Sequence, residues 1–196
     1  MEIEYKWEKP GGVQALAESG LLADMLVSAG AMHMHAVYYD SPDGLVHEAF
    51  GGLRVRHEGP ESVCCMKLPA PGSRDAKRRQ EYEVPAADIH EGLEKLPAAG
   101  APEELCTALL ERGVVVLCET EFDRRAAVVE RSGFSAELAY DVGEMRRGGR
   151  VAPICEVELE FTGGEEEAFH AFAAQLESEL GLQQQPLSKL ARAMCL

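Results

Sequence analysis

Hydrophobic and polar residues alternate with a period of two along much of this chain, as is typical of β-strands with one buried face. The opening segment EIEYKWE places Ile3, Tyr5 and Trp7 on one side of a strand and charged residues on the other. Similar patterns predict further strands over residues 32–40, 52–58, 62–68, 79–84, 114–120 running into 121–129, 136–141, 144–147 and 151–161.

A few helices are expected around these strands. The clearest is EEEAFHAFAAQLESEL, which is amphipathic, has acidic residues in its first turn and is followed by Gly181. Helical segments are predicted over residues 10–19, 86–95, 102–112 and 165–180, with a short helix or turn in the tail PLSKLARAMCL.

Composition indicates one soluble domain. The chain has 196 residues, 46% of them hydrophobic, and contains no repeat or linker that would divide it, so we expect a single α+β domain over residues 1–196. It lacks an apolar run long enough to span a membrane, and its charged N-terminus lacks a signal core, so a cytoplasmic location is expected. The scattered cysteines predict neither a zinc site nor a disulfide framework.

The formal net charge of −15 argues against nucleic-acid binding and against binding to an anionic membrane surface. It also means that an anionic ligand would be repelled by the overall field of the protein. Such a ligand would need a local enclosure of cations or bound metal ions.

At least five predicted strands carry an ionic face, formed by Glu2, Glu4 and Lys6, by Arg54 and Arg56, by Lys67, by Arg79, Glu81 and Glu83, and by Glu156, Glu158 and Glu160. A solvated sheet surface explains any one of them. Together they favour another interpretation, because charges of one sign are gathered on single strands. A barrel with its polar side inward and helices outside would explain all five. Its interior would be wet, with the charges compensated by metal ions and an anionic ligand.

An ordered set of motifs resembles the CYTH domain, also called the triphosphate tunnel metalloenzyme family, and within it the inorganic triphosphatase branch. The opening EIEYK fits the family signature ExExK, and the resemblance extends over essentially the whole chain. The motifs that carry it, in chain order, are EIEYK, YYDSPD, GLRVR, MK, RQEYEV, TEFDR, LAYDVGE, PICEVELE and LSKLAR.

This resemblance implies a closed eight-stranded antiparallel β-tunnel with a polar interior, flanked by a few helices. It implies hydrolysis of inorganic tripolyphosphate to pyrophosphate and phosphate, with Mg²⁺ or Mn²⁺ as the cofactor. The partner is then a small-molecule triphosphate, and the chain would be a monomer or a homodimer. Mg²⁺ prefers carboxylate and phosphate oxygens, and guanidinium groups bind phosphate through two hydrogen bonds, so the residue types agree with this chemistry.

By the same resemblance, Glu2, Glu4 and Lys6 are the catalytic residues. The implied metal ligands are Glu2, Glu4, Asp141, Glu156, Glu158 and Glu160. The implied substrate-binding residues are Lys6, Arg54, Arg56, Lys67, Arg124, Lys189 and Arg192. Either Arg124 or Arg125 lines the tunnel, and the spacing from Thr120 and Phe122 favours Arg124.

Other functions remain open on the same residues. A class IV adenylyl cyclase or a thiamine or nucleoside triphosphatase would share the ExExK and basic positions. A non-catalytic polyphosphate-binding module would keep the cations and lose the carboxylates, which are intact here. His33 and His35 are expected on a strand surface, Asp40 and Asp43 in a turn, and the adjacent Cys64 and Cys65 are assigned no chemistry.

Overall fold

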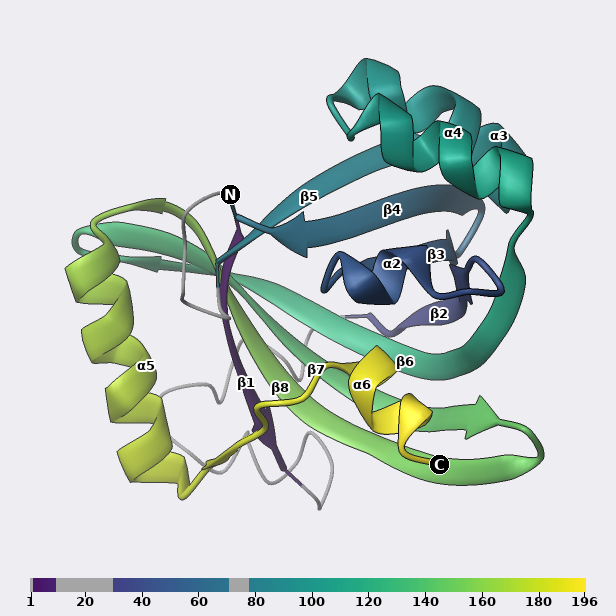
Figure 1. Ribbon diagram of the computed structural model, residues 1–196. Coiled ribbons are helices and arrows are strands. Elements are labelled where there is room, and N and C mark those ends of the chain that lie inside the picture. Colours follow the sequence, from purple (N-terminus) through teal and green to yellow (C-terminus); the bar gives the residue numbers. More distant parts are fainter. Residues whose placement is uncertain (1, 10–29, 71–77) are drawn as a thin grey trace.

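The computed structural model describes residues 2–9, 30–70 and 78–196 (Figure 1). The helix expected over residues 10–19 lies outside this part. None of the described helices combines the length and apolar character that crossing a membrane requires. The described strands are β1 (Glu2–Glu8), β2 (Met32–Asp40), β3 (Gly52–Glu58), β4 (Glu61–Pro69), β5 (Arg78–Pro85), β6 (Val115–Arg131), β7 (Phe134–Arg147), β8 (Arg150–Gly164) and β9 (Gln183–Gln184). The helices are α2 (Leu45–Glu48), α3 (Ile89–Lys95), the 3₁₀ helix η1 (Leu96–Ala99), α4 (Glu103–Arg112), α5 (Glu166–Leu180) and α6 (Lys189–Met194).

The expected α+β class is confirmed, and the expected closed eight-stranded tunnel is corrected. The described residues form a nine-stranded antiparallel sheet in the order β5-β4-β3-β2-β6-β7-β8-β1-β9. Strands β5 and β1 meet only at the pairs Glu2–Arg79 and Ile3–Arg78, so the curled sheet is not closed along its length. From Glu4 onward, β1 pairs with β8, and at its far end it also pairs with β9.

The expected run of 114–120 into 121–129 is confirmed as one strand, β6. The segments expected separately at 136–141 and 144–147 also form one strand, β7, which is longer than the sequence pattern predicts. Gly143 lies inside β7 and faces Phe122 of β6. A Cβ atom at Gly143 would lie 2.1 Å from the carbonyl oxygen of Glu121, so this glycine permits close strand contact where the pattern indicated a break.

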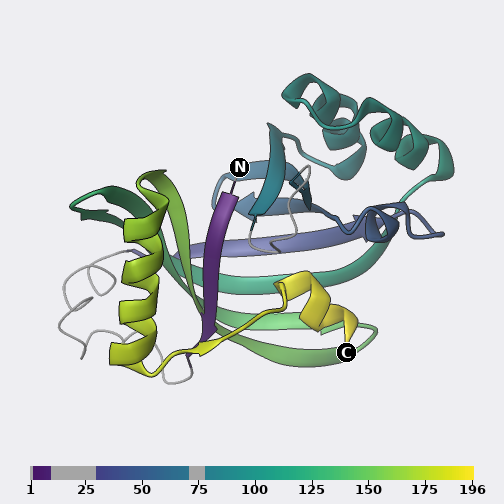
Figure 2. The same cartoon turned by 60° about the vertical axis from the view of Figure 1, so that its left-hand side comes forward.

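Helices cover the apolar outer face of the sheet, as predicted. Helix α5 lies across β1, β7 and β8 (Figure 2). Trp7 and Ile3 belong to the buried core between this helix and the sheet. Helices α3 and α4 cover β3, β4 and β5 at the opposite side of the molecule. The odd-numbered residues of β1 therefore face this outer core, and Glu4 and Lys6 face the inside of the curl.

The inside of the curl is only partly polar, which corrects the expectation of a polar interior. Inward-facing side chains of β2, β6, β7 and β8 form an apolar cluster, and α6 packs against it through Leu190 and Ala193. This cluster and α6 close one end of the interior, so the charged residues are concentrated in the remaining part. The strand residues of the cluster are Met34, Ala36, Tyr38, Cys118, Phe122, Met145 and Ile154.

Candidate functional site

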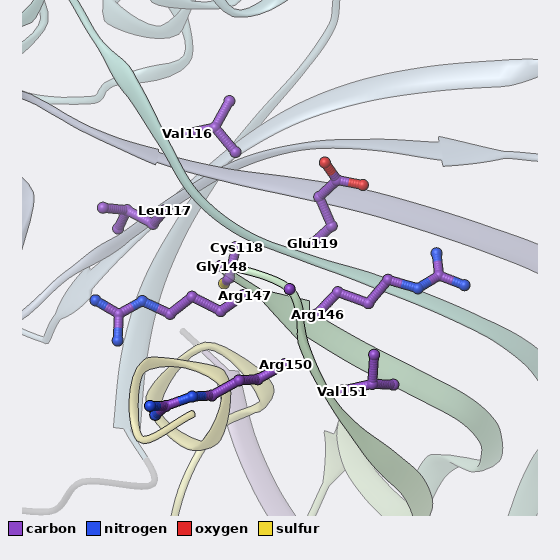
Figure 3. Close-up of a pocket in the computed structure, with 10 residues that line it drawn as sticks. Val116, Leu117, Cys118, Glu119, Arg146, Arg147, Gly148, Arg150 and Val151 are labelled. Atoms are coloured by element: carbon purple, nitrogen blue, oxygen red, sulfur yellow. The ribbon is translucent and has the colours of Figure 1, made fainter.

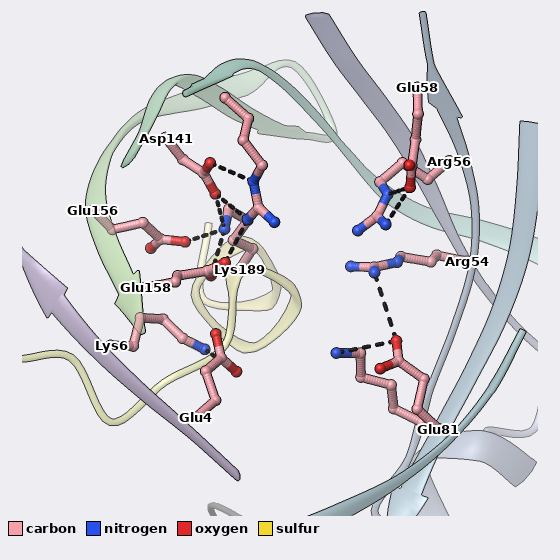
Figure 4. A network of polar contacts seen from close by, with 12 residues as sticks. Glu4, Lys6, Arg54, Arg56, Glu58, Glu81, Asp141, Glu156, Glu158 and Lys189 are labelled. Carbon is pink, nitrogen blue, oxygen red and sulfur yellow. Dashed lines mark hydrogen bonds and ion pairs between the residues drawn. The ribbon is translucent and has the colours of Figure 1, made fainter. Parts of the chain in front are cut away.

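A cavity of about 890 Å³ lies inside the curled sheet and is lined by strands from both halves of the chain. Figure 4 shows two groups of charged side chains facing each other, with Asp141, Glu156 and Glu158 on one side and Arg54 and Arg56 on the other. The residues expected from the sequence that line the cavity are Glu4, Lys6, Arg54, Arg56, Lys67, Arg124, Glu158, Glu160 and Lys189.

Strand register brings three carboxylates together on the first side. Asp141 of β7 pairs directly with Glu156 of β8, and Glu158 follows on the same face of β8 two residues later. One oxygen from each lies within 4.8 Å of the other two. Asp141 and Glu156 are fully buried, so the cluster requires strong electrostatic compensation.

Lys189 of α6 supplies much of that compensation. Its Nζ lies 2.7 Å from Asp141 Oδ2 and 2.8 Å from Glu158 Oε1, and it also forms an ion pair with Glu156. Arg124 donates through Nε and Nη2 to the two oxygens of Asp141, each at 2.7 Å, and also contacts Glu158. The spacing argument that favoured Arg124 as the inward-facing arginine is thus confirmed.

These contacts and burial shift the pKa values of the neighbouring carboxyls Glu156 and Glu158 in opposite directions. Burial alone would raise the pKa of Glu158, but Lys189, Arg124 and Lys6 outweigh it and hold that pKa well below its ordinary value. For Glu156, burial prevails over the attraction of Lys189, and the nearby charge of Glu158 also contributes, so its pKa is raised. The carboxylates raise the pKa of Lys189 despite its burial, so this cation is retained.

The facing side is basic. Lys67 Nζ lies 3.2 Å from Glu81 Oε1, and Arg54 Nη2 lies 3.9 Å from the same oxygen. Arg56 forms an ion pair with Glu58. Burial would raise the pKa of Glu81, but Lys67, the hydrogen bond from Cys65 and Arg54 together lower it to about 2. Three cations are thereby held on one wall by two carboxylates.

Strand β1 lies beside the acidic side. Glu4 pairs directly with Glu160 of β8, which in turn pairs with Glu137 of β7, so three carboxylates form a row across adjacent strands. All three line the cavity. Lys6 Nζ lies 3.6 Å from Glu4 Oε2 and faces Glu158 across the ladder.

The carboxylate cluster fits a hard divalent cation in its donor chemistry. Asp141, Glu156 and Glu158 offer only oxygen ligands, as Mg²⁺ and Mn²⁺ prefer. Glu156 Oε1 is buried and accepts no hydrogen bond from the described residues, although Lys189 lies at ion-pair distance. A buried carboxylate oxygen that accepts no hydrogen bond has a lone pair available, so it is suited to binding a metal ion.

Among the expected site residues that the structure describes, Asp141, Glu156 and Arg192 do not line the cavity. The backbone of Glu2 pairs with Arg79, and its side chain lies outside what the structure describes. Arg192 lies behind the cluster and forms an ion pair with Glu156. His33 lies outside the cavity and contacts Asp123 at 3.1 Å, in agreement with the expected strand-surface position.

Several cavity residues were absent from the residues assigned a role from the sequence. The sequence pattern places Arg79, Glu81 and Glu83 on one ionic face and gives no chemistry to Arg79 or Glu83, yet all three line the cavity. Cys65 also lines the cavity, where its Sγ donates to Glu81 Oε1 at 2.9 Å. The period-two pattern carries the signal for part of this set, because Glu58 shares a face with Arg56, Cys65 with Lys67 and Glu137 with Asp141. For β5 it shows only that Arg79, Glu81 and Glu83 share one ionic face. The additional charged lining residues are Glu58, Arg79, Glu81, Glu83 and Glu137.

Known proteins resemble this chain in both sequence and structure. An inorganic triphosphatase from Haemophilus influenzae is 27% identical over 160 residues, which is 81% of this chain and 44% of that protein. The chain therefore spans less than half the length of this curated relative.

Two solved structures share the fold over nearly their whole length. HpAC1 from Hippeastrum, described as a suspected adenylyl cyclase with a dominant triphosphatase activity, has a TM-score of 0.66 and 19% identity, covering 100% of this chain and 96% of that chain. A proposed adenylate cyclase from Bacillus halodurans has a TM-score of 0.61 and 17% identity, covering 96% of this chain and 94% of that chain. The CYTH domain model matches residues 1–194. The chain belongs to the CYTH domain family.

Proposed function

We propose that this chain, folded as one CYTH domain over residues 1–196, is a divalent-metal-dependent triphosphatase of the cytoplasm that hydrolyses inorganic tripolyphosphate to pyrophosphate and phosphate. The observation that carries the proposal is that the carboxylate cluster of Asp141, Glu156 and Glu158 faces Arg54 and Arg56 (Figure 4). Glu158, Arg54 and Arg56 line the same cavity, and Asp141 and Glu156 are buried directly behind Glu158. A polyanion with bound cations is complementary to both sides at once.

The basic side would bind the phosphate chain. Arg54 and Arg56 extend from β3 on the same face, and Lys67 extends from β4 beside them. Guanidinium groups can bind phosphate oxygens in pairs, and the lysine adds a compact charge. Because these cations are already held by Glu58 and Glu81, little conformational freedom would be lost on binding.

The acidic side would hold the metal. Glu4, Asp141, Glu156, Glu158 and Glu160 are the described ligand candidates, and Glu2 completes the set proposed from the family resemblance. Mg²⁺ or Mn²⁺, when bound, neutralises phosphate charge and polarises the terminal phosphoryl group. Water attacks the terminal phosphorus, the bond to the bridging oxygen breaks, and pyrophosphate leaves. Lys6, beside Glu4, is placed to offset negative charge on the reacting phosphates.

The decisive experiment measures phosphate release from tripolyphosphate with Mg²⁺ or Mn²⁺. We expect turnover that EDTA abolishes and that Glu4→Gln reduces by at least about 100-fold, since a charged ligand is lost. Glu119→Gln is the matched control, because Glu119 faces outward on β6 toward His35. Equal activity of Glu4→Gln and the parent would refute the assignment.

Product analysis separates the alternatives on the same fold. With ATP, release of ADP and phosphate identifies a hydrolase, whereas cyclic AMP and pyrophosphate identify an adenylyl cyclase. Thiamine triphosphate tests the organic triphosphatase. Tight binding of tripolyphosphate without turnover in any divalent metal would instead identify a polyphosphate-binding module.

A further inference from the structure

Helix α6 carries the central cation of the site but is too short to hold its own position. It spans Lys189–Met194, and isolated helices of this length are unstable in water. Ser188 caps its beginning by accepting a hydrogen bond from the Ala191 amide at 3.1 Å. The position of the Lys189 ammonium group therefore depends on what fixes the rest of α6.

The far end of α6 is held by the hairpin between β7 and β8. Arg147, the last residue of β7, donates through Nη1 to the carbonyl oxygen of Met194 at 2.7 Å. Arg150, the first residue of β8, donates to the main-chain oxygen of Leu196. Figure 3 shows the Arg150 side chain extending over the coil of α6, with Arg147 beside it. Carbonyl oxygens at a helix end lack intrahelical donors, so guanidinium donors stabilise them.

The turn that joins these arginines is suited to holding both of them toward α6. Gly148 and Gly149 have φ values of 55° and 82°, in the left-handed region that two-residue hairpin turns require. The neighbouring Arg146 has a different role. It points away from α6 and pairs with Glu121 and Glu144 on the outer face of the sheet. Adjacent arginines of one hairpin thus contact different structures.

We propose that Arg147, assisted by Arg150, is a positioning residue that fixes α6 and so places Lys189 for its role in the site. This inference rests on the proposed function, because it takes Lys189 as one of the triphosphate-binding residues that the family resemblance implies. Lys189 simultaneously contacts Asp141, Glu156 and Glu158, so a shift of α6 changes all three contacts. Displacements of about 1 Å at a reacting centre can cost about 100-fold in rate.

The test compares Arg147→Ala with Arg146→Ala, which removes an arginine from the same hairpin without touching α6. We expect Arg147→Ala to raise KM for tripolyphosphate about tenfold, with a smaller change in kcat, and Arg147→Lys to restore part of the loss. Arg146→Ala should stay within about twofold of the parent. Amide hydrogen exchange of residues 189–194 should become faster in Arg147→Ala alone.

A double-mutant cycle tests whether Arg147 acts through Lys189. In a Lys189→Gln background, assayed with Mn²⁺ present, adding Arg147→Ala should change KM by less than about twofold. An independent tenfold effect in that background, or unchanged hydrogen exchange in the single variant, overturns the inference. Amide hydrogen exchange and calorimetric measurement of tripolyphosphate binding can both be carried out on a protein that does not hydrolyse the ligand. Binding without hydrolysis would therefore contradict the proposed function and still decide the role of Arg147, whereas a chain that neither binds nor hydrolyses tripolyphosphate overturns both.

Discussion

The ammonium nitrogen of Lys189 lies 2.7 Å from Asp141 Oδ2, at the centre of a buried carboxylate cluster. Lys189 is in the C-terminal helix α6 and Asp141 is in the middle of β7, so the contact joins the helix that closes the interior to the acidic side of the site. The protein's own cation thus contacts the same oxygens that could hold a metal ion. Stability and metal binding should consequently be linked through this lysine.

Replacement of Lys189 by methionine should expose that link. Removing one partner of a buried ion pair leaves uncompensated charge, so we expect a loss of about 3–5 kcal/mol in the free energy of unfolding. Mg²⁺ or Mn²⁺ should restore part of the loss, giving a larger metal-dependent rise in Tm than in the parent. Thermal unfolding with EDTA and with each metal measures both effects. The control is Lys95→Met, which removes an exposed helix pair with Glu91. A metal response no larger than that of the parent would contradict the prediction.

Arg124 should not be replaceable by lysine. Its guanidinium donates to both oxygens of Asp141, and a lysine keeps the charge but cannot form this paired contact. We expect Arg124→Lys to lower kcat/KM for tripolyphosphate by about tenfold or more, which corresponds to about 1.4 kcal/mol. Arg125→Lys is the matched control, since the next residue of the strand faces the other side. Similar kinetics for the two variants would show that the paired geometry does not matter.

The Glu81 carboxyl should contribute to loss of stability in acid. Its pKa is lowered from 4.5 to about 2 in the folded protein. A lowered folded-state pKa gives stability that is fully present above about 4.5 and is lost as the pH falls toward about 2. Glu81→Gln should therefore flatten the dependence of the unfolding free energy on pH in this interval, by at most about 3 kcal/mol. Urea unfolding across this pH range measures it. Because the pKa of Glu158 is also lowered, the unfolding free energy of the variant should still fall somewhat in acid. If it falls as steeply with pH as that of the parent, Glu81 has no role in the acid sensitivity.

Gly143 should be intolerant of even a methyl group. A Cβ atom there would lie 2.1 Å from Glu121 O and 2.4 Å from the Cα of Phe122. The Phe122 ring lies beneath Lys189, with its centroid 4.9 Å from Nζ, so the strain would also reach the site. We expect Gly143→Ala to cost at least about 1–3 kcal/mol in urea unfolding and to reduce activity. In the control Gly163→Ala, the added atom would lie 3.4 Å from Ser135 Oγ, and a much smaller effect is expected.

Much of the site could be predicted from the alternation of polar and apolar residues along the strands. The period-two pattern correctly placed Glu4, Lys6 and Arg124 on the inward face, because neighbouring side chains on a strand point in opposite directions. It could not show that Asp141 pairs with Glu156, since register depends on how distant strands meet. The pattern also indicated a strand end at Gly143, whereas this glycine lies inside a strand at a point of close contact with its neighbour.

The strand-rich α+β class, the charged inner faces and the family could all be inferred from the order of residues along the chain. Folding in three dimensions was needed to show that β1 leaves β5 after Ile3, that a ninth strand lies beside it, and that part of the interior is apolar. It also decided that Lys189 reaches the carboxylate cluster while Arg147 holds the other end of its helix. The physical reason is that local alternation fixes which way a side chain points along its own strand. The partners that it meets depend on long-range strand register and on the docking of a short helix that cannot position itself.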